Sequence, residues 1–171
     1  MPFYLRTGKH LSARQTEIAN RFRDAPFTAF QNTRVNAMPT NWLVLRIAPV
    51  ESISLEFEVK RPGPEVELAA VELEFGYDDW FAASSAVGYE TLFYDVMTGD
   101  LSLFMRADMV DQAWRVVQPV QDAWAAEKPA FPDYASGSAG PKAAAHLIRK
   151  HGGRRWRSLD APKPRKETKN G

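Results

Sequence analysis

The chain has 171 residues, of which 44% are hydrophobic and 12% aromatic, and this composition is typical of a folded globular protein. It contains no cysteine, which excludes disulfide frameworks and thiolate metal sites. No apolar stretch approaches the roughly 20 residues that a membrane helix needs, and the amino terminus lacks a signal-peptide pattern. We therefore expect a cytoplasmic protein with no membrane partner.

The net charge of +1 is unevenly distributed along the chain. Between residues 154 and 171, seven cations stand against two acids, so the rest of the chain is mildly acidic. A nucleic-acid surface would spread basic residues over a folded face, with aromatic residues between them. Here the cations crowd around Pro162 and Pro164, which favours a solvated tail and no nucleic-acid partner. We expect a folded domain over residues 1–156 and a basic, disordered tail over residues 157–171.

The first half of the chain alternates apolar and polar residues with a period of two. In residues 52–60 the odd-numbered positions are apolar and the even-numbered ones are Ser, Glu or Lys. This pattern predicts an antiparallel strand with one buried and one wet face. The turn Pro62-Gly63-Pro64 separates this run from the next one. The expected strands, at least five in a mostly antiparallel sheet, are residues 3–6, 17–23, 42–47, 53–59 and 70–77.

The second half changes to helical spacing. Apolar residues recur at positions that predict a helix over 86–98, and Gly99 is its expected end. A second helix is expected over 107–128, where Pro119 should kink or split it, and a short third one over 142–150. Strands first and helices after predict the α+β class, with helices packed on one face of the large, mostly antiparallel sheet.

No motif in the sequence carries recognisable catalytic chemistry. The three histidines, His10, His146 and His151, have no spacing that suggests a metal cluster or a triad. The pair Asp78-Asp79 closes a strand and is interpreted as turn residues, and Gly137 to Gly140 is interpreted as a tight turn before a helix. From the residues alone we assign no catalytic, cofactor-binding or metal-binding residue.

Lys9 and Arg14 are the candidate binding residues. They follow the half-apolar opening Met1-Pro-Phe-Tyr-Leu-Arg, which stops at Thr7-Gly8. Two such cations suit a sugar phosphate, because its dianionic phosphate accepts charge-assisted hydrogen bonds from Lys and Arg. The residues alone leave open that they are simply an exposed pair on a loop.

The opening resembles that of the carboxy-terminal domain of glucose-6-phosphate dehydrogenase, which usually contains Pro-Phe-Tyr-Leu-Arg-Thr-Gly-Lys. The resemblance extends from Pro2 to about Trp156, and in that family the positions of Lys9 and Arg14 contact the sugar phosphate. Further matches follow in the right order: Asn41-Trp-Leu-Val-Leu-Arg-Ile, Lys60-Arg-Pro-Gly, Tyr89-Glu-Thr-Leu, Gly99-Asp-Leu-Ser-Leu-Phe-Met-Arg, Ala113-Trp, Ala123-Trp, Tyr134-Ala-Ser-Gly-Ser-Ala-Gly-Pro and Gly153-Arg-Arg-Trp.

The resemblance implies an NADP-dependent oxidation of glucose 6-phosphate to its lactone, in the pentose phosphate pathway. The family's coenzyme lies on an amino-terminal Rossmann domain, and its histidine base follows an Asp-His-Tyr-Leu-Gly-Lys segment. Neither pattern occurs in this sequence. We therefore expect a truncated form that is inactive alone, binds glucose 6-phosphate weakly, and forms a homo-oligomer through its sheet as family members do.

The sequence also departs from the family pattern at binding positions. Ala48 stands where a substrate-holding Gln is frequent, and Asn20 stands where an aliphatic residue is usual. Some family members bind a second, structural NADP, and only the basic residues Arg6 and Arg46 of that site are kept. We therefore expect this chain to hold no NADP tightly. The positions of that site that have lost a basic residue are Gln15, Ala19, Glu56 and Ala139.

Two other interpretations stay open at this point. The chain could be a stand-alone sugar-phosphate-binding or assembly module that pairs with itself or with an intact dehydrogenase, or it could be the inactive product of a decaying gene. A Rossmann segment encoded just upstream would indicate a fragment or split gene, and an unrelated upstream region would favour an independent module.

Overall fold

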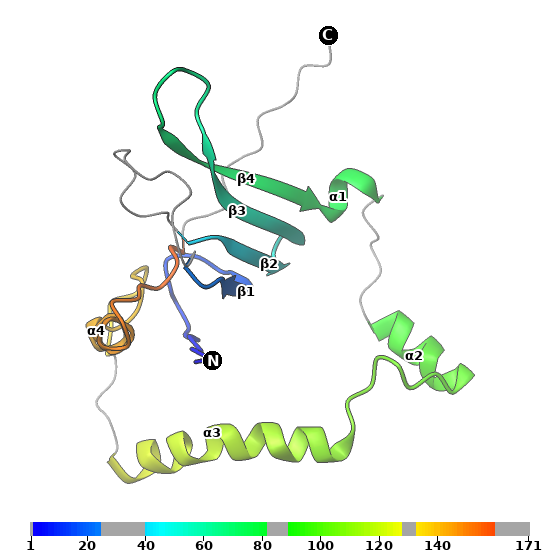
Figure 1. Cartoon of the computed structure of the whole chain (residues 1–171). Coiled ribbons are helices and arrows are strands. Elements are labelled where there is room, and N and C mark those ends of the chain that lie inside the picture. Colours follow the sequence, from blue (N-terminus) through cyan, green and yellow to red (C-terminus); the bar gives the residue numbers. More distant parts are fainter. Residues whose placement is uncertain (1, 25–39, 82–88, 128–132, 160–171) are drawn as a thin grey trace. The chain divides into compact units, whose positions relative to one another are not determined.

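The computed structural model describes residues 2–24, 40–81, 89–127 and 133–159 (Figure 1). These residues form two compact units: one runs to Phe81 and resumes at Ser136, and the other lies between these limits in the sequence. The strands are β1 (Thr16–Arg21), β2 (Trp42–Ala48), β3 (Ser52–Lys60) and β4 (Leu68–Gly76), and the helices are α1 (Tyr77–Trp80), α2 (Tyr89–Thr98), α3 (Ala107–Glu127) and α4 (Lys142–Lys150).

The four strands form one antiparallel sheet in chain order, so that each strand pairs with the strand that follows it. β3 and β4 are joined by the predicted turn, where Gly63 has a φ of 139° that side-chain-bearing residues rarely adopt. The Nζ of Lys60 donates a hydrogen bond of 2.6 Å to the Gly63 carbonyl and closes this turn. The predicted α+β class and antiparallel sheet are confirmed.

The expected strand at residues 3–6 is wrong. In the described part of the chain the sheet has four strands, and the opening segment lies outside it. Side chains hold this segment instead: Tyr4 packs edge-on against Trp156, and the Arg6 guanidinium lies 5.1 Å from the centre of the same indole. Apolar alternation in a short segment does not reveal whether a partner strand is available. Here the segment packs against the Trp156 side chain instead of pairing with a strand.

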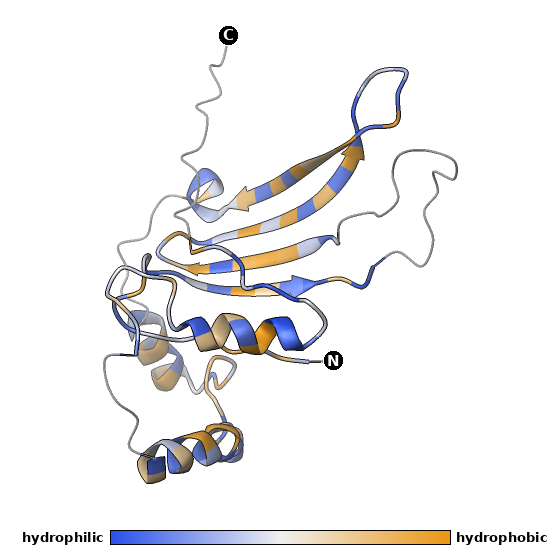
Figure 2. Cartoon of the chain, turned by 90° about the vertical axis from the view of Figure 1, so that its left-hand side faces the viewer, coloured by the Kyte–Doolittle hydropathy of each residue, from blue (hydrophilic) through white to orange (hydrophobic). Residues whose placement is uncertain are grey.

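The cross-strand register gives the sheet one apolar and one polar face, and Figure 2 shows the two kinds of residue alternating along the strands. The sequence pattern suggested that the apolar face is buried and the polar face wet. In the structure, however, Ser52 and Ser54 of the polar face are buried, whereas Ile53 is 38% and Leu73 62% exposed. Part of the reason is that the Arg46 side chain lies across both serines and hydrogen-bonds them.

The second unit contains α2, which ends as the sequence predicts. Gly99 has a φ of 76°, its N–H donates to the Val96 carbonyl, and the next N–H, of Asp100, donates to the Asp95 carbonyl at 2.9 Å. These paired bonds satisfy carbonyls that a helix end otherwise leaves without donors, and they need a residue in the left-handed conformation. Glycine adopts that conformation without a steric cost.

Helix α3 runs from Ala107 to Glu127 with Pro119 inside it, so the proline does not split the helix. Trp114 and Trp124 of this helix are 57% and 60% exposed. The packing of helices on one face of the sheet stays a prediction.

The first unit is completed by α4 and the segment that follows it. The helix begins directly after Pro141, as predicted, and the Nε1 of Trp156 donates a hydrogen bond of 3.0 Å to the Ala144 carbonyl on it. Asp78 and Asp79, expected in a turn, lie in the single-turn helix α1 after β4. Residues 160–171 of the expected tail lie outside the described residues, and the boundary between domain and tail stays a prediction.

Candidate functional site

Lys9 and Arg14 lie on one loop between the opening segment and β1, and both are exposed. Lys9 sits at a bend, and Arg14 comes two residues before the first residue of β1. The structure therefore places both residues that are predicted to contact the sugar phosphate on a single exposed loop. Two exposed cations on one loop are able to meet an anion that arrives from solution.

The loop is anchored to a distant part of the first unit. Leu11 forms a parallel bridge with Ser138, and backbone hydrogen bonds flank that bridge on both sides. The sequence correctly predicts a tight turn at residues 137–140 but not its contact with this loop. No local pattern could have shown the contact, because the two segments lie at opposite ends of the described chain.

The polar face of the sheet is filled by ion pairs between the chain's own side chains. Arg46 contacts Glu74 at 2.9 Å and Glu72 at 3.2 Å, which ties β2 to β4 across β3. Arg157 binds Glu56 through both terminal nitrogens, at 2.6 and 3.0 Å, and its Nε lies 3.3 Å from Glu17. The sequence analysis did not find the role of Arg157, since it placed this residue in the tail.

These contacts shift the pKa values of the groups involved. Hydrogen bonding to Glu56 raises the pKa of Arg157 above its ordinary range, in spite of partial burial. Burial pushes the pKa of Glu72 up, but hydrogen bonds from Ser54 and Arg46 outweigh it, so that the pKa falls below its ordinary value of 4.5. Burial lowers the pKa of Arg6, and the charge of Glu17 partly offsets this.

A family model described as the carboxy-terminal domain of glucose-6-phosphate dehydrogenase matches residues 1–157. The chain belongs to this family. It is 41% identical over 158 residues to glucose-6-phosphate 1-dehydrogenase 2 of Mycobacterium tuberculosis, and 44% identical over 157 residues to glucose-6-phosphate 1-dehydrogenase of Aggregatibacter actinomycetemcomitans. Each alignment covers 92% of this chain, but 30% and 31% of the respective relative, so the chain spans about a third of their length.

Solved structures of the same family share the fold. A glucose-6-phosphate dehydrogenase in complex with its substrate glucose 6-phosphate superposes with a TM-score of 0.71 at 29% identity, over 88% of this chain and 30% of that one. The enzyme from Mycobacterium avium superposes with a TM-score of 0.64 at 30% identity, over 91% of this chain and 31% of that one. These similarities agree with the resemblance drawn from the opening segment.

Arg6 and Arg46 are the two basic residues that the resemblance assigns to a structural NADP. The two cations kept from that site are already engaged: Arg46 pairs with Glu72 and Glu74, and Arg6 lies over Trp156. Glu56, at a position where the resemblance leads us to expect a cation, faces the same side of the sheet as Arg46. Uncancelled carboxylates near a phosphate raise its electrostatic energy. The absence of tight NADP binding stays a prediction, with which these contacts agree.

The other two departures from the family pattern lie on β1 and β2. Ala48 is the last residue of β2 and offers no side-chain donor to a substrate. Asn20 is opposite Leu43 and only half-buried, and it is not among the buried side chains without a hydrogen-bond partner in the described residues. The cost of about 1–3 kcal/mol that an unpaired buried amide would bring therefore does not arise.

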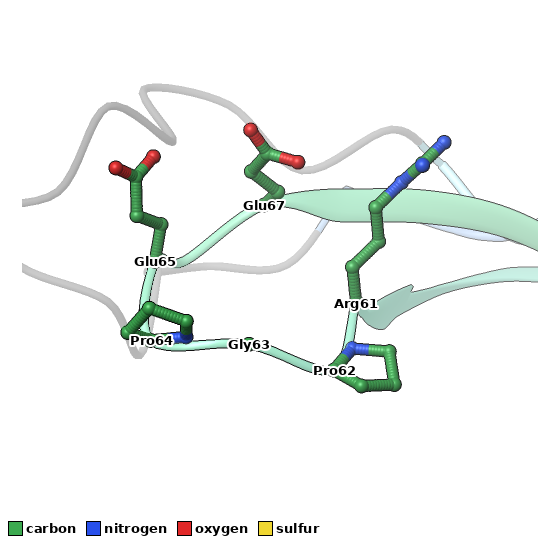
Figure 3. Close-up of a pocket in the computed structure, with 6 residues that line it drawn as sticks. All are labelled: Arg61, Pro62, Gly63, Pro64, Glu65 and Glu67. Carbon is green, nitrogen blue, oxygen red and sulfur yellow. The ribbon is translucent and has the colours of Figure 1, made fainter.

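A shallow hollow of about 260 Å³ lies at the turn between β3 and β4, away from Lys9 and Arg14 in the sequence (Figure 3). Glu65, Glu67 and Arg61 project to one side of this turn, and Pro62 and Pro64 form its base. Two carboxylates against one guanidinium make the lining net acidic. The hollow is therefore not suited to a phosphate and is not the candidate site.

Neither a cluster of metal ligands nor a membrane-spanning helix is found within the residues that the structure covers. No group of three or more His, Asp or Glu side chains there is arranged to hold a metal ion. None of the helices in those same ranges combines the length and apolarity required to cross a bilayer.

Proposed function

We propose that this chain is the carboxy-terminal, substrate-completing domain of a glucose-6-phosphate dehydrogenase, in which Lys9 and Arg14 bind the phosphate of glucose 6-phosphate. The observation that carries the proposal is the exposed cation pair on an anchored loop, in a domain that belongs to this family. One similar solved structure is a complex with glucose 6-phosphate, which supports this substrate.

In a complete enzyme, other segments would carry the remaining parts of the reaction. There, NADP would accept the hydride and a histidine would take the proton of the sugar's C1 hydroxyl. This chain would act in the cytoplasm, would contribute binding and orientation only, and would be inactive and weakly binding when isolated. Placing the phosphate also places the reactive carbon, and such orientation lowers the entropic part of a reaction barrier.

Titration with glucose 6-phosphate, followed by NMR, tests this proposal. We expect saturable shifts at the amides of residues 7–14 and none with unphosphorylated glucose. Lys9→Ala and Arg14→Ala should each weaken binding by about tenfold, since a hydrogen bond to a charged group contributes on the order of 1.5 kcal/mol. Arg149→Ala, which removes an exposed cation from α4, is the matched control. Equal affinities in all three variants would contradict the proposal.

A second function, assembly, is favoured by a separate observation. The apolar face of the sheet is partly exposed, with Ile18 at 51%, Ile47 at 49% and Leu73 at 62%. Apolar side chains that gather on one exposed face can form an interaction surface. We propose that this face joins two copies of the chain, or one copy and an intact dehydrogenase.

A further inference from the structure

The turn over residues 137–140, here called the brace, holds the loop of Lys9 and Arg14 by its backbone. The N–H of Gly137 donates a hydrogen bond of 2.8 Å to the His10 carbonyl, and the N–H of Ser12 donates one of 2.9 Å to the Ser138 carbonyl. Leu11 lies between these bonds and bridges Ser138. The brace therefore holds residues 10–12, which lie between Lys9 and Arg14 in the sequence.

The backbone of His10 shows that the loop is firmly held. Its φ is 57°, a left-handed value that non-glycine residues adopt infrequently. Such a conformation persists only where its surroundings determine it, and here the His10 carbonyl is bound by the Gly137 N–H. Bends lie on both sides of the bridge, and both Lys9, before His10, and Arg14, after Ser12, are exposed.

The brace itself depends on glycines. Gly137 has a φ of 78°, with open space where a Cβ would lie, so only its backbone conformation requires glycine. Gly140 has a φ of 101°, and its Cβ would lie 3.6 Å from the Leu11 side chain. The Ser138 hydroxyl accepts a hydrogen bond of 3.3 Å from the Gly140 N–H, which closes the turn upon itself.

We propose that the brace is a positioning element for phosphate binding: it orders the Lys9 and Arg14 loop before the ligand arrives. This inference rests on the proposed function, since it explains how that same cation pair is held. Ordering one residue's backbone costs roughly 1–2 kcal/mol, so a loop that is already ordered binds with less loss of entropy. The brace residues act through the loop and need not touch the sugar phosphate.

The test compares two alanine substitutions at glycines of the same conformation. Gly137→Ala weakens the brace, and Gly99→Ala is the matched control, because Gly99 has a φ of 76°, open space around it, and ends α2 in the other unit. Both should lower stability to a similar extent. At a temperature where both are folded, we expect Gly137→Ala to weaken glucose 6-phosphate binding about fivefold to tenfold, the factor expected for re-ordering one residue. Gly99→Ala should bind like the unmodified chain, and Gly137→Asn, which tolerates positive φ, should recover most of the affinity.

Hydrogen exchange provides a second measurement that does not need ligand. The backbone amides of residues 12 and 137 should exchange faster in Gly137→Ala than in Gly99→Ala. If the unmodified chain binds and depends on Lys9 and Arg14, but the two alanine variants bind equally, the brace inference is overturned and the proposed function stands. If the unmodified chain does not bind, the proposed function fails and the role in phosphate binding fails with it. Unchanged exchange of these two amides in Gly137→Ala would also overturn the inference about the brace.

Discussion

Arg157 is the residue whose structural role differs most from what its position in the sequence suggests. It follows directly on Trp156 at the start of the basic stretch, yet its guanidinium is bound by Glu56 and Glu17 and lies 5.4 Å from the centre of the Trp42 ring. Its side chain is only 22% exposed. A planar guanidinium satisfies two carboxylates and an aromatic face at once, which a lysine could not do.

We therefore expect Arg157→Ala to destabilise the chain by about 2 kcal/mol, the order of magnitude for hydrogen bonds to charged groups that are left without a partner. Thermal unfolding of the purified variant measures this. Arg155→Ala is the control, because the neighbouring Arg155 is exposed. Equal midpoints for the two variants would show that the ion pairs of Arg157 contribute nothing to stability.

Glu72 makes the stability of the fold depend on pH in acidic solution. Its pKa is lower in the folded chain than its ordinary value of 4.5, because Ser54 and Arg46 stabilise the charged form. A lowered folded-state pKa contributes stability that is present above pH 4.5 and is lost as the pH falls through the folded-state value. The contribution is reduced by solvent, since the side chain is 42% exposed.

Glu72→Gln should therefore narrow the stability difference between neutral and acidic solution. Urea midpoints measured from pH 7 down to about pH 3 should fall less steeply in this variant than in the unmodified chain. Glu65→Gln, at the exposed turn between β3 and β4, should leave the slope unchanged. A parallel fall of the urea midpoint in all three proteins would show that Glu72 does not contribute to the pH dependence of stability.

At the scale of elements, the two faces of the sheet differ in the side chains that lie over them. Side chains from β2 and from the segment after α4 cover the polar face, while the apolar face keeps Ile53 and Leu73 partly exposed. Aliphatic side chains in this position favour association, since each square ångström of apolar area removed from water contributes about 25 cal/mol.

A single added charge tests the role of the apolar face. Leu73→Lys should reduce self-association in sedimentation at micromolar concentration, because a lysine ammonium in a dry interface costs several kcal/mol. The control is Ala70→Lys, which adds the same charge on the same strand but on the polar face. If the unmodified chain is a monomer, or if both variants associate equally, the assembly proposal fails.

At the scale of the whole molecule, the chain spans about a third of the relatives that it matches, and this sets what it is expected to do alone. We expect no reduction of NADP with glucose 6-phosphate above the buffer rate, measured by NADPH absorbance. Binding should weaken as salt rises, because exposed charges are screened over about 10 Å at 0.1 M ionic strength. Turnover by the unmodified chain that is lost in the Lys9→Ala, Arg14→Ala double variant would contradict this.

The sequence by itself determined the family, the α+β class, the four described strands of the sheet to within about two residues, and the helices that end at Gly99 and begin after Pro141. These features depend on local periodicity, on glycine and proline, and on matches in linear order, all of which are visible in the chain. The candidate residues Lys9 and Arg14 came from the resemblance, and their role stays a prediction.

Only the tertiary structure decided that side chains cover the polar face of the sheet, where the opening segment lies, and what holds the candidate loop. Residue alternation gives the same pattern whether the apolar or the polar face is covered, so it could not show that Ser54 is buried. The contacts of Arg157 with Glu56 and of Gly137 with His10 join segments far apart in sequence. Such contacts depend on the path of the whole chain, and no local pattern records them.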